Sequence, residues 1–219
     1  AKIIVCGRNK DRLDKAKDAC GNHTELIIGD LLETATQEKI QESASRNKIS
    51  LAILNAGTNG YINADQFDAA RANNLMIQNY FSMTQCIESV LPSLLESKGQ
   101  LALMSSVAAY GGLAKASAYC ASKSAIRALS QSLDLELRGK GVAVTCICPG
   151  FVKTPLTDIN TFKMPFLISP EKATAHIICG LQKKHHEIHF PKRFSVLMKL
   201  IMSLPSGVAY KILSKVGVT

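Results

Sequence analysis

Short runs of hydrophobic residues alternate along the chain with longer segments in which apolar residues return at helical spacing. Runs without polar alternation are typical of strands buried on both faces, and strands that alternate with helices indicate parallel crossover connections. The runs are 3–6, 26–28, 51–54, 101–104, 142–147 and a weaker 188–190, and the helical segments are 10–20, 36–46, 69–91, 118–138 and 170–183. The pattern predicts an α/β fold built on an open, doubly wound parallel sheet.

The composition is that of one ordinary globular domain, which we assign to residues 1–219. Hydrophobic residues make up 47% and charged residues 20%, which excludes disordered and fibrous classes. No apolar run reaches the roughly 18–20 residues that a membrane-spanning helix needs, and no leader opens the sequence. The seven scattered cysteines are typical of packing thiols in a reducing compartment, so we expect a cytoplasmic protein.

The formal charge of +9 raises the question of an anionic partner. Nucleic acid is disfavoured because the basic residues are spread along the chain, aromatic residues are only 5%, and no nucleic-acid-binding motif is present. A cofactor that carries phosphate or a membrane surface fits the charge equally well.

Polar or glycine-containing segments directly follow the first five apolar runs. They are Gly7-Arg8, Gly29-Asp30, Asn55-Ala56-Gly57, Ser105-Ser106 and Cys148-Pro149-Gly150. The carboxyl ends of parallel strands lie along one edge of a sheet, which is where such folds bind ligands. We therefore expect these five segments to form one binding crevice.

The helix that follows Ser106 carries Tyr119 and Lys123, one turn apart on the same face. A free phenol, with a pKa of about 10, holds its proton too tightly to act as a base near neutrality. A nearby lysine ammonium favours the phenolate and lowers that pKa, so the tyrosine could exchange a proton with a substrate oxygen.

Four motifs together resemble the short-chain dehydrogenases/reductases. They are "NAG" at 55–57, "SS" at 105–106, "YCASK" at 119–123 and "PGFVKT" at 149–154, and the resemblance runs through nearly the whole chain. It implies that Tyr119 is the general acid in carbonyl reduction and the base in alcohol oxidation, while Ser106 holds the substrate oxygen. It also implies that Lys123 lowers the phenol pKa and binds the nicotinamide ribose, and that Asn74 holds a proton-relay water.

The resemblance further implies a set of cofactor contacts at the strand ends. They are Asn55, Ala56 and Gly57 on the adenine-ribose side, Asp30 and Leu31 at the adenine ring, and Pro149, Gly150, Val152 and Thr154 at the nicotinamide carboxamide and pyrophosphate. An acidic residue after the first strand would select NAD, whereas an arginine pairs with the 2′-phosphate of NADP. Arg8 stands there, so we expect NADP, with NADPH preferred over NADH.

The family's glycine-rich turn, T-G-x-x-x-G-x-G, is absent from the sequence, and Ala1 falls where the family's second strand begins. The expected fold is therefore a three-layer, Rossmann-like doubly wound parallel sheet that is N-terminally truncated, as in a fragment of a longer protein. We do not expect a metal site. The histidines of "KKHHEIH" at 183–189 would point to opposite faces of a strand, and Cys146 and Cys148 have no second pair.

The tail, residues 191–219, is amphipathic. Phe194, Leu197, Met198, Ile201 and Leu204 recur at helical spacing beside Lys192, Arg193 and Lys199. Such a helix could cover the substrate pocket, lie on an anionic membrane or pack against another subunit. Apolar residues in the loop 162–168, among them Met164, Phe166 and Leu167, favour a hydrophobic substrate.

The leading hypothesis is an NADP-dependent oxidoreductase that interconverts a carbonyl and an alcohol by hydride transfer. Two alternatives stay open: a membrane-associated lipid carbonyl reductase, and a non-catalytic binding or regulatory protein on the same fold. Analogy with the family indicates a homo-oligomer.

Overall fold

Six parallel strands form the centre of the protein. A computed structural model describes residues 2–158 and 164–216. The strands are β1 (Ile3–Gly7), β2 (Thr24–Ile28), β3 (Leu51–Leu54), β4 (Gln100–Met104), β5 (Ala143–Pro149) and β6 (Glu187–Phe190). Each of the six predicted apolar runs is thus confirmed as a strand, and every pairing between them is parallel.

The strands form two sheets within the described residues, β1–β2 and β3–β4–β5–β6. β4 and β5 have a neighbour on each side and are almost fully buried, as predicted. β1 pairs only with β2, and β3 pairs only with β4. Ile3, Leu51 and Ile53 on these two strands are consequently exposed, although their apolar runs predict burial on both faces.

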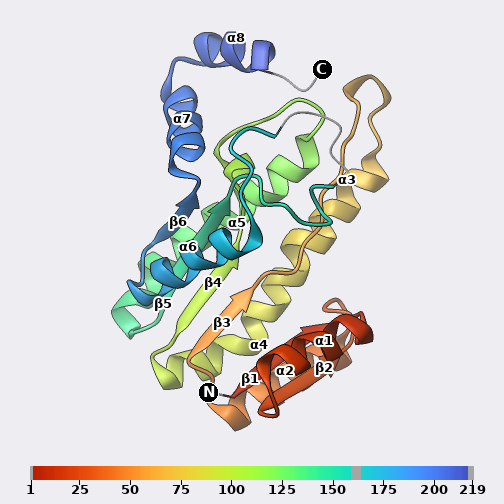
Figure 1. The fold of residues 1–219 in the computed structure, drawn as a ribbon, viewed down its shortest axis with the longest axis vertical. Coiled ribbons are helices and arrows are strands. Elements are labelled where there is room, and N and C mark those ends of the chain that lie inside the picture. Colours follow the sequence, from red (N-terminus) through yellow and green to blue (C-terminus); the bar gives the residue numbers. More distant parts are fainter. Residues whose placement is uncertain (1, 159–163, 217–219) are drawn as a thin grey trace.

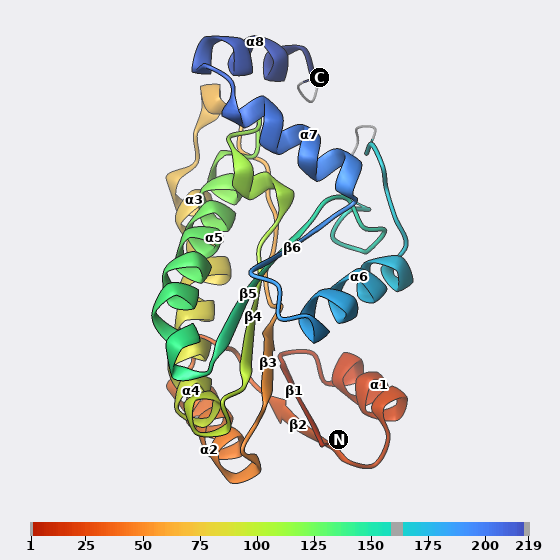
Figure 2. The same ribbon diagram turned by 90° about the vertical axis from the view of Figure 1, so that its left-hand side faces the viewer.

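Helices cover both faces of the strands and complete three layers. They are α1 (Lys10–Cys20), α2 (Thr34–Asn47), α3 (Ala69–Met76), α4 (Ser82–Ser97), α5 (Ser117–Leu137), α6 (Pro170–Gln182), α7 (Lys192–Ser203) and α8 (Ser206–Val216). Figures 1 and 2 show α2, α3, α4 and α5 on one side of the strands and α1 and α6 on the other. The doubly wound α/β arrangement agrees with the prediction.

The predicted helix 69–91 is divided by a π-helical segment, Ile77–Phe81, which joins α3 to α4. The backbone N–H of Ser82 bonds to the carbonyl of Ile77, five residues back. This widened turn changes which side chains face the sheet.

The main core lies between the second sheet and the helices α4 and α5, with Leu94, Leu101, Ile126 and Val144 fully buried. It packs the strands against α4 and against the middle and end of α5, where Ile126 and Leu137 belong to the same cluster. Figure 2 shows α7 and α8 at the end of the molecule where the carboxyl ends of these strands lie. Residues from five separate segments can therefore meet there.

Candidate active site

A cavity of about 1140 Å³ opens at the carboxyl ends of β3, β4 and β5. It extends to α6 and α7, so strand ends form one side and helices form the other. Nine of the predicted site residues line it: Asn55, Gly57, Ser106, Tyr119, Lys123, Pro149, Gly150, Val152 and Thr154. The expectation of one shared crevice is met for β3, β4 and β5.

Ser106 and Tyr119 are held together in this cavity. Ser106 follows β4 and caps a short 3₁₀ turn, where its Oγ accepts a hydrogen bond from the Ala108 N–H at 3.1 Å. The same hydroxyl lies 3.4 Å from the Pro149 carbonyl, and it is close enough to the Tyr119 phenol to lower the pKa of that group. Tyr119 lies in the first turn of α5, so its position follows from the packing of α5 on β5.

The pKa of Tyr119 lies above its ordinary value because the phenol is buried, and the Ser106 hydroxyl offsets only part of that rise. The sequence-based expectation was that Lys123 lowers this pKa. In the structure the Lys123 ammonium lies 5.9 Å from the centre of the Tyr119 ring, and burial is the largest influence on the phenol pKa. At neutral pH the phenol is therefore a proton donor.

Lys123 is itself buried, and its Nζ donates a hydrogen bond to the Met104 carbonyl at 3.0 Å. Burial lowers the pKa of this lysine to about 8. The backbone next to it is held by Ser105, whose Oγ donates to the Lys123 carbonyl at 2.7 Å. The site thus contains an ammonium that titrates close to physiological pH.

The structure does not place Asn74 with these residues. Asn74 is exposed on α3, whereas Asn79, in the π-helical segment, is fully buried beside the cavity. Its amide contacts both the N–H and the carbonyl of Thr58, at 2.7 and 3.0 Å, and Ser122 Oγ at 3.0 Å. We therefore assign Asn79 in place of Asn74. Helical periodicity misses it because the π turn shifts the helix phase.

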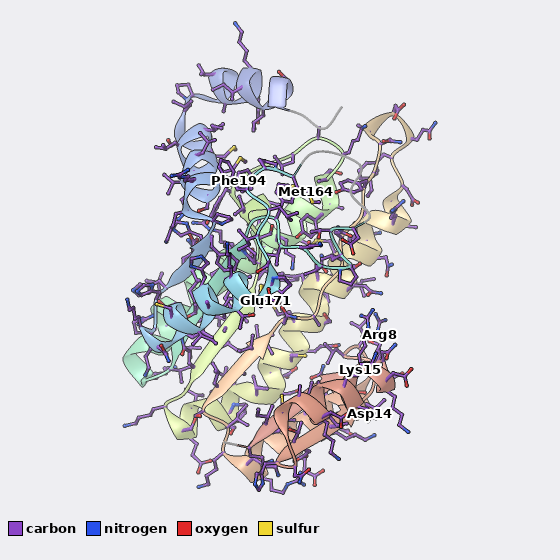
Figure 3. All side chains as sticks on the ribbon, in the orientation of Figure 1. Arg8, Asp14, Lys15, Met164, Glu171 and Phe194 are labelled. Atoms are coloured by element: carbon purple, nitrogen blue, oxygen red, sulfur yellow. The ribbon has the colours of Figure 1, made fainter. Side chains whose placement is uncertain are left out.

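Four other predicted residues, Arg8, Asp30, Leu31 and Ala56, do not line the cavity. Arg8 Nη1 lies 3.4 Å from Asp30 Oδ2, so the ends of β1 and β2 meet each other as expected. Figure 3 shows Arg8 beside the first sheet. Arg12, one helical turn further along α1, does line the cavity, although sequence reasoning did not select it.

Aromatic rings form an apolar wall opposite the strand ends. Phe194 of α7, labelled in Figure 3, stacks on Phe151 with ring centres 5.6 Å apart, and the ring centre of Phe166 lies 6.3 Å from that of Phe194. Met198 of α7 also lines the cavity. Of the loop residues expected to contact substrate, Phe162 lies outside the described residues. The tail helix is thus one wall of the cavity.

The profile of the "short chain dehydrogenase" family matches residues 1–163. The chain belongs to the short-chain dehydrogenase/reductase family. An "Uncharacterized oxidoreductase" of Myxococcus xanthus is 34% identical over 211 residues, which cover 94% of this chain and 83% of that protein. A "Fatty acyl-CoA reductase" of Acinetobacter baylyi is 26% identical and covers 95% of this chain and 72% of its own length.

Among solved structures, this short-chain dehydrogenase is similar to one from Burkholderia cenocepacia, described as a complex with NADP. The two share 22% identity, with a TM-score of 0.82 and coverage of 97% of this chain and 86% of the other. The similarity supports the fold, and the family match makes the protein an oxidoreductase with an NAD(P)-binding Rossmann fold. Among the described residues, no helix is both long and apolar enough to cross a membrane.

Proposed function

We propose that the protein is an NADPH-dependent reductase that converts a hydrophobic ketone or aldehyde to an alcohol. One observation carries this proposal: Tyr119, Ser106 and the buried Lys123 line one cavity together with an apolar aromatic wall. A proton donor, a polar anchor for an oxygen and an ammonium therefore converge on one space.

The residues present fit a nicotinamide dinucleotide. The cavity of about 1140 Å³ exceeds the roughly 300–1000 Å³ of common small-molecule sites, which leaves room for both a cofactor and a substrate. Gly57 lets the backbone after β3 pass close to Asn79 and Lys123. A Cβ at this position would lie 3.1 Å from Asn79 Oδ1 and 3.3 Å from Lys123 Nζ. Lys123 and the segment from Pro149 to Thr154 would hold the nicotinamide half, and Asn55 would lie on the adenine-ribose side.

A bound nicotinamide supplies the hydride that reduces the carbonyl carbon. Ser106 orients the substrate oxygen toward the phenol, and Tyr119 gives it a proton as negative charge develops. The raised pKa of Tyr119 suits this direction, because the phenol is protonated at neutral pH. Lys123 stabilises the phenolate that is left, and Asn79 fixes the backbone at Thr58 beside it.

Two guanidinium groups support NADP over NAD. Arg8 follows β1, where a 2′-phosphate would come close, and Arg12 lines the cavity from the next helical turn. The NADP complex of the Burkholderia cenocepacia neighbour agrees with this choice. We expect Arg8→Ala to weaken NADPH binding far more than NADH binding, because only NADPH carries the 2′-phosphate.

The apolar wall supports a hydrophobic substrate. Phe151, Phe194 and Met198 line the cavity, and the Acinetobacter baylyi relative is described as a fatty acyl-CoA reductase. A long aliphatic carbonyl compound such as decanal is therefore a suitable first assay substrate.

The deciding experiment measures NADPH-dependent reduction of decanal by the wild type, Tyr119→Phe and Tyr80→Phe. Tyr119→Phe should lower kcat by roughly 10²–10⁴-fold and leave the Kd for NADPH unchanged, because only the proton donor is lost. Tyr80 does not line the cavity, so Tyr80→Phe should retain turnover. Full activity in Tyr119→Phe would overturn the mechanism. NADPH binding without turnover of any carbonyl by the wild type would favour a non-catalytic binding protein.

A further inference from the structure

Helix α7 has two apolar sides rather than one. Met198 and Ile201 are buried, and Phe194 stacks on Phe151, so this side covers the cavity. Lys199 ties the helix to the body through an ion pair of 2.6 Å with Glu187. The pocket-cover interpretation of the tail therefore accounts for the inner side, but leaves the outer side without a role.

The outer side of α7 continues onto α8 as a second apolar face, which we call the outer face. Its large hydrophobic residues are between 40% and 66% exposed: Val196, Leu197, Leu200, Leu204, Val208 and Tyr210. The three on α7, Val196, Leu197 and Leu200, follow helical spacing, so they form one stripe, and Leu204 follows directly after the helix. Figures 1 and 2 show both helices at one end of the molecule, with α8 outermost. Burial in the protein's own core does not explain this stripe.

The charged residues of the tail sequence all have the same sign. Residues 188–219 contain five basic residues, namely Lys192, Arg193, Lys199, Lys211 and Lys215, and no aspartate or glutamate. Arg193 lies on the same stripe, one turn before Leu197 and two turns before Leu200, and Lys211 is exposed on α8. Lysine and arginine beside exposed leucines can place their stems on an apolar surface and their charges in water.

We propose that the outer face docks the protein on an anionic lipid bilayer. Exposed apolar residues flanked only by basic ones are the pattern of helices that lie in a membrane interface. α7 has 12 residues and α8 has 11. At about 1.5 Å per residue neither spans the roughly 30 Å hydrocarbon layer, so both would lie in the plane of the surface.

A second copy of this chain is a poorer occupant of the outer face. A two-fold contact would bring the same surface of both copies together, so that basic residues of one copy would lie among basic residues of the other. Like charges across a contact oppose association. Anionic lipid head groups neutralise the same charges, and each basic residue near such a surface adds to binding.

Docking in this orientation has a consequence for substrate access, which rests on the proposed function. Met198 of α7 and Leu213 of α8 line the cavity, so the helices that would touch the bilayer also form its wall. A hydrophobic carbonyl compound dissolved in the bilayer would then enter close to the apolar wall. Binding to the membrane itself does not depend on catalysis.

The test is flotation of the full chain with vesicles of phosphatidylglycerol and phosphatidylcholine, compared with pure phosphatidylcholine vesicles. We expect binding to the anionic vesicles only, decreasing as salt is added. Arg193→Gln with Lys211→Gln should lower the partition coefficient on the order of tenfold. Lys140→Gln with Lys183→Gln, two exposed lysines outside the tail, is the matched control and should bind like the wild type.

The apolar contribution is tested by Leu197→Glu with Leu200→Glu, which should abolish flotation. Leu135→Glu is its control, because Leu135 is 86% exposed on α5, away from the outer face. Thermal unfolding checks that each variant is folded, and Tyr119→Phe should float like the wild type whether or not the proposed catalysis is correct. Equal flotation of the tail variants and their controls would overturn the proposal. Dimerisation of the wild type that Leu197→Glu abolishes would assign the outer face to a second copy and also overturn it.

Discussion

Gly57 shows how one missing side chain makes the site possible. A Cβ at this position would lie 3.1 Å from Asn79 Oδ1 and 3.3 Å from Lys123 Nζ, closer than most side chains tolerate. Both polar groups are buried and hydrogen-bonded, so they have little freedom to move away. The close approach of the chain after β3 therefore depends on glycine.

We expect Gly57→Ala to lower stability by about 1–3 kcal/mol through overpacking, and to lower kcat roughly tenfold by displacing Lys123. Urea unfolding and steady-state turnover measure the two effects. Gly112→Ala is the control, since a Cβ there meets nothing within 4 Å. Equal stability and turnover of the two variants would show that the approach at Gly57 is not tight.

Lys123 predicts a pH dependence of stability. Burial lowers its pKa to about 8, whereas it is about 10.4 in an unfolded chain. Between these values the unfolded chain binds more protons, so the free energy of unfolding rises with pH through this window. Lys123→Met removes the buried charge and should be more stable than the wild type at pH 7.

The difference between Lys123→Met and the wild type should shrink by on the order of 2–3 kcal/mol between pH 7 and pH 10. Urea unfolding across this range measures it, and Lys140→Met, at an exposed lysine, should show no such convergence. A constant difference would mean that Lys123 titrates as a free lysine does.

At the scale of elements, Ser106, Tyr119 and Lys123 could be placed together from sequence because a strand end and one helical turn fix their spacing. Asn79 could not, because residues 69–91 have the periodicity of one continuous helix. The π turn at Ile77–Phe81 depends on tertiary packing and not on a local motif. The same limit applies to α7, where Leu197 and Met198 share an apolar pattern but face opposite environments.

Glu187 links three elements and holds α7 over the cavity. Its carboxylate accepts hydrogen bonds from Tyr110 at 3.0 Å and Arg127 at 2.7 Å, and it pairs with Lys199 at 2.6 Å. Burial alone would raise the pKa of Glu187, but the bonds from Lys199 and Arg127 bring it below its ordinary value. The stabilisation is therefore present above about pH 4.3 and is lost as pH falls through the lower folded-state pKa.

Glu187→Gln should lower stability by about 1–3 kcal/mol at pH 7, since it leaves two cations with a neutral partner. It should also speed proteolytic cleavage near α7. Thermal unfolding and limited trypsin digestion measure the two effects, and Glu38→Gln, at an exposed glutamate, is the control. The difference in stability between Glu187→Gln and the wild type should narrow as the pH falls below about 4.3. A deficit that does not change with pH would assign the effect to packing.

At the scale of the whole molecule, the sequence predicts the strands, their parallel direction and their order with the helices, because each depends on local hydrophobic pattern. The separation of the described strands into β1–β2 and β3–β6 does not depend on local pattern, since pairing between distant segments leaves no periodic signal. The cavity nevertheless draws residues from both parts: Arg12 comes from α1, which packs on the first sheet, and Lys123 from α5, which packs on the second.

A cofactor that contacts both Arg12 and Lys123 should stabilise the two sheets together. We expect NADPH at 100 times its Kd to add about 2.7 kcal/mol to the stability of the folded state, and to slow amide hydrogen exchange in β1 and β2 as well as in β4 and β5. Exchange followed by mass spectrometry, with and without NADPH, gives the protection of each strand.

NADH lacks the 2′-phosphate, so at equal occupancy it should slow exchange in β4 and β5, while exchange in β1 and β2 should stay closer to that of the free protein. In the double variant Arg8→Ala with Arg12→Ala, NADPH should protect the four strands from exchange to the same extent as NADH does. Equal protection of β1 and β2 by both cofactors would show that Arg8 and Arg12 do not bind the 2′-phosphate.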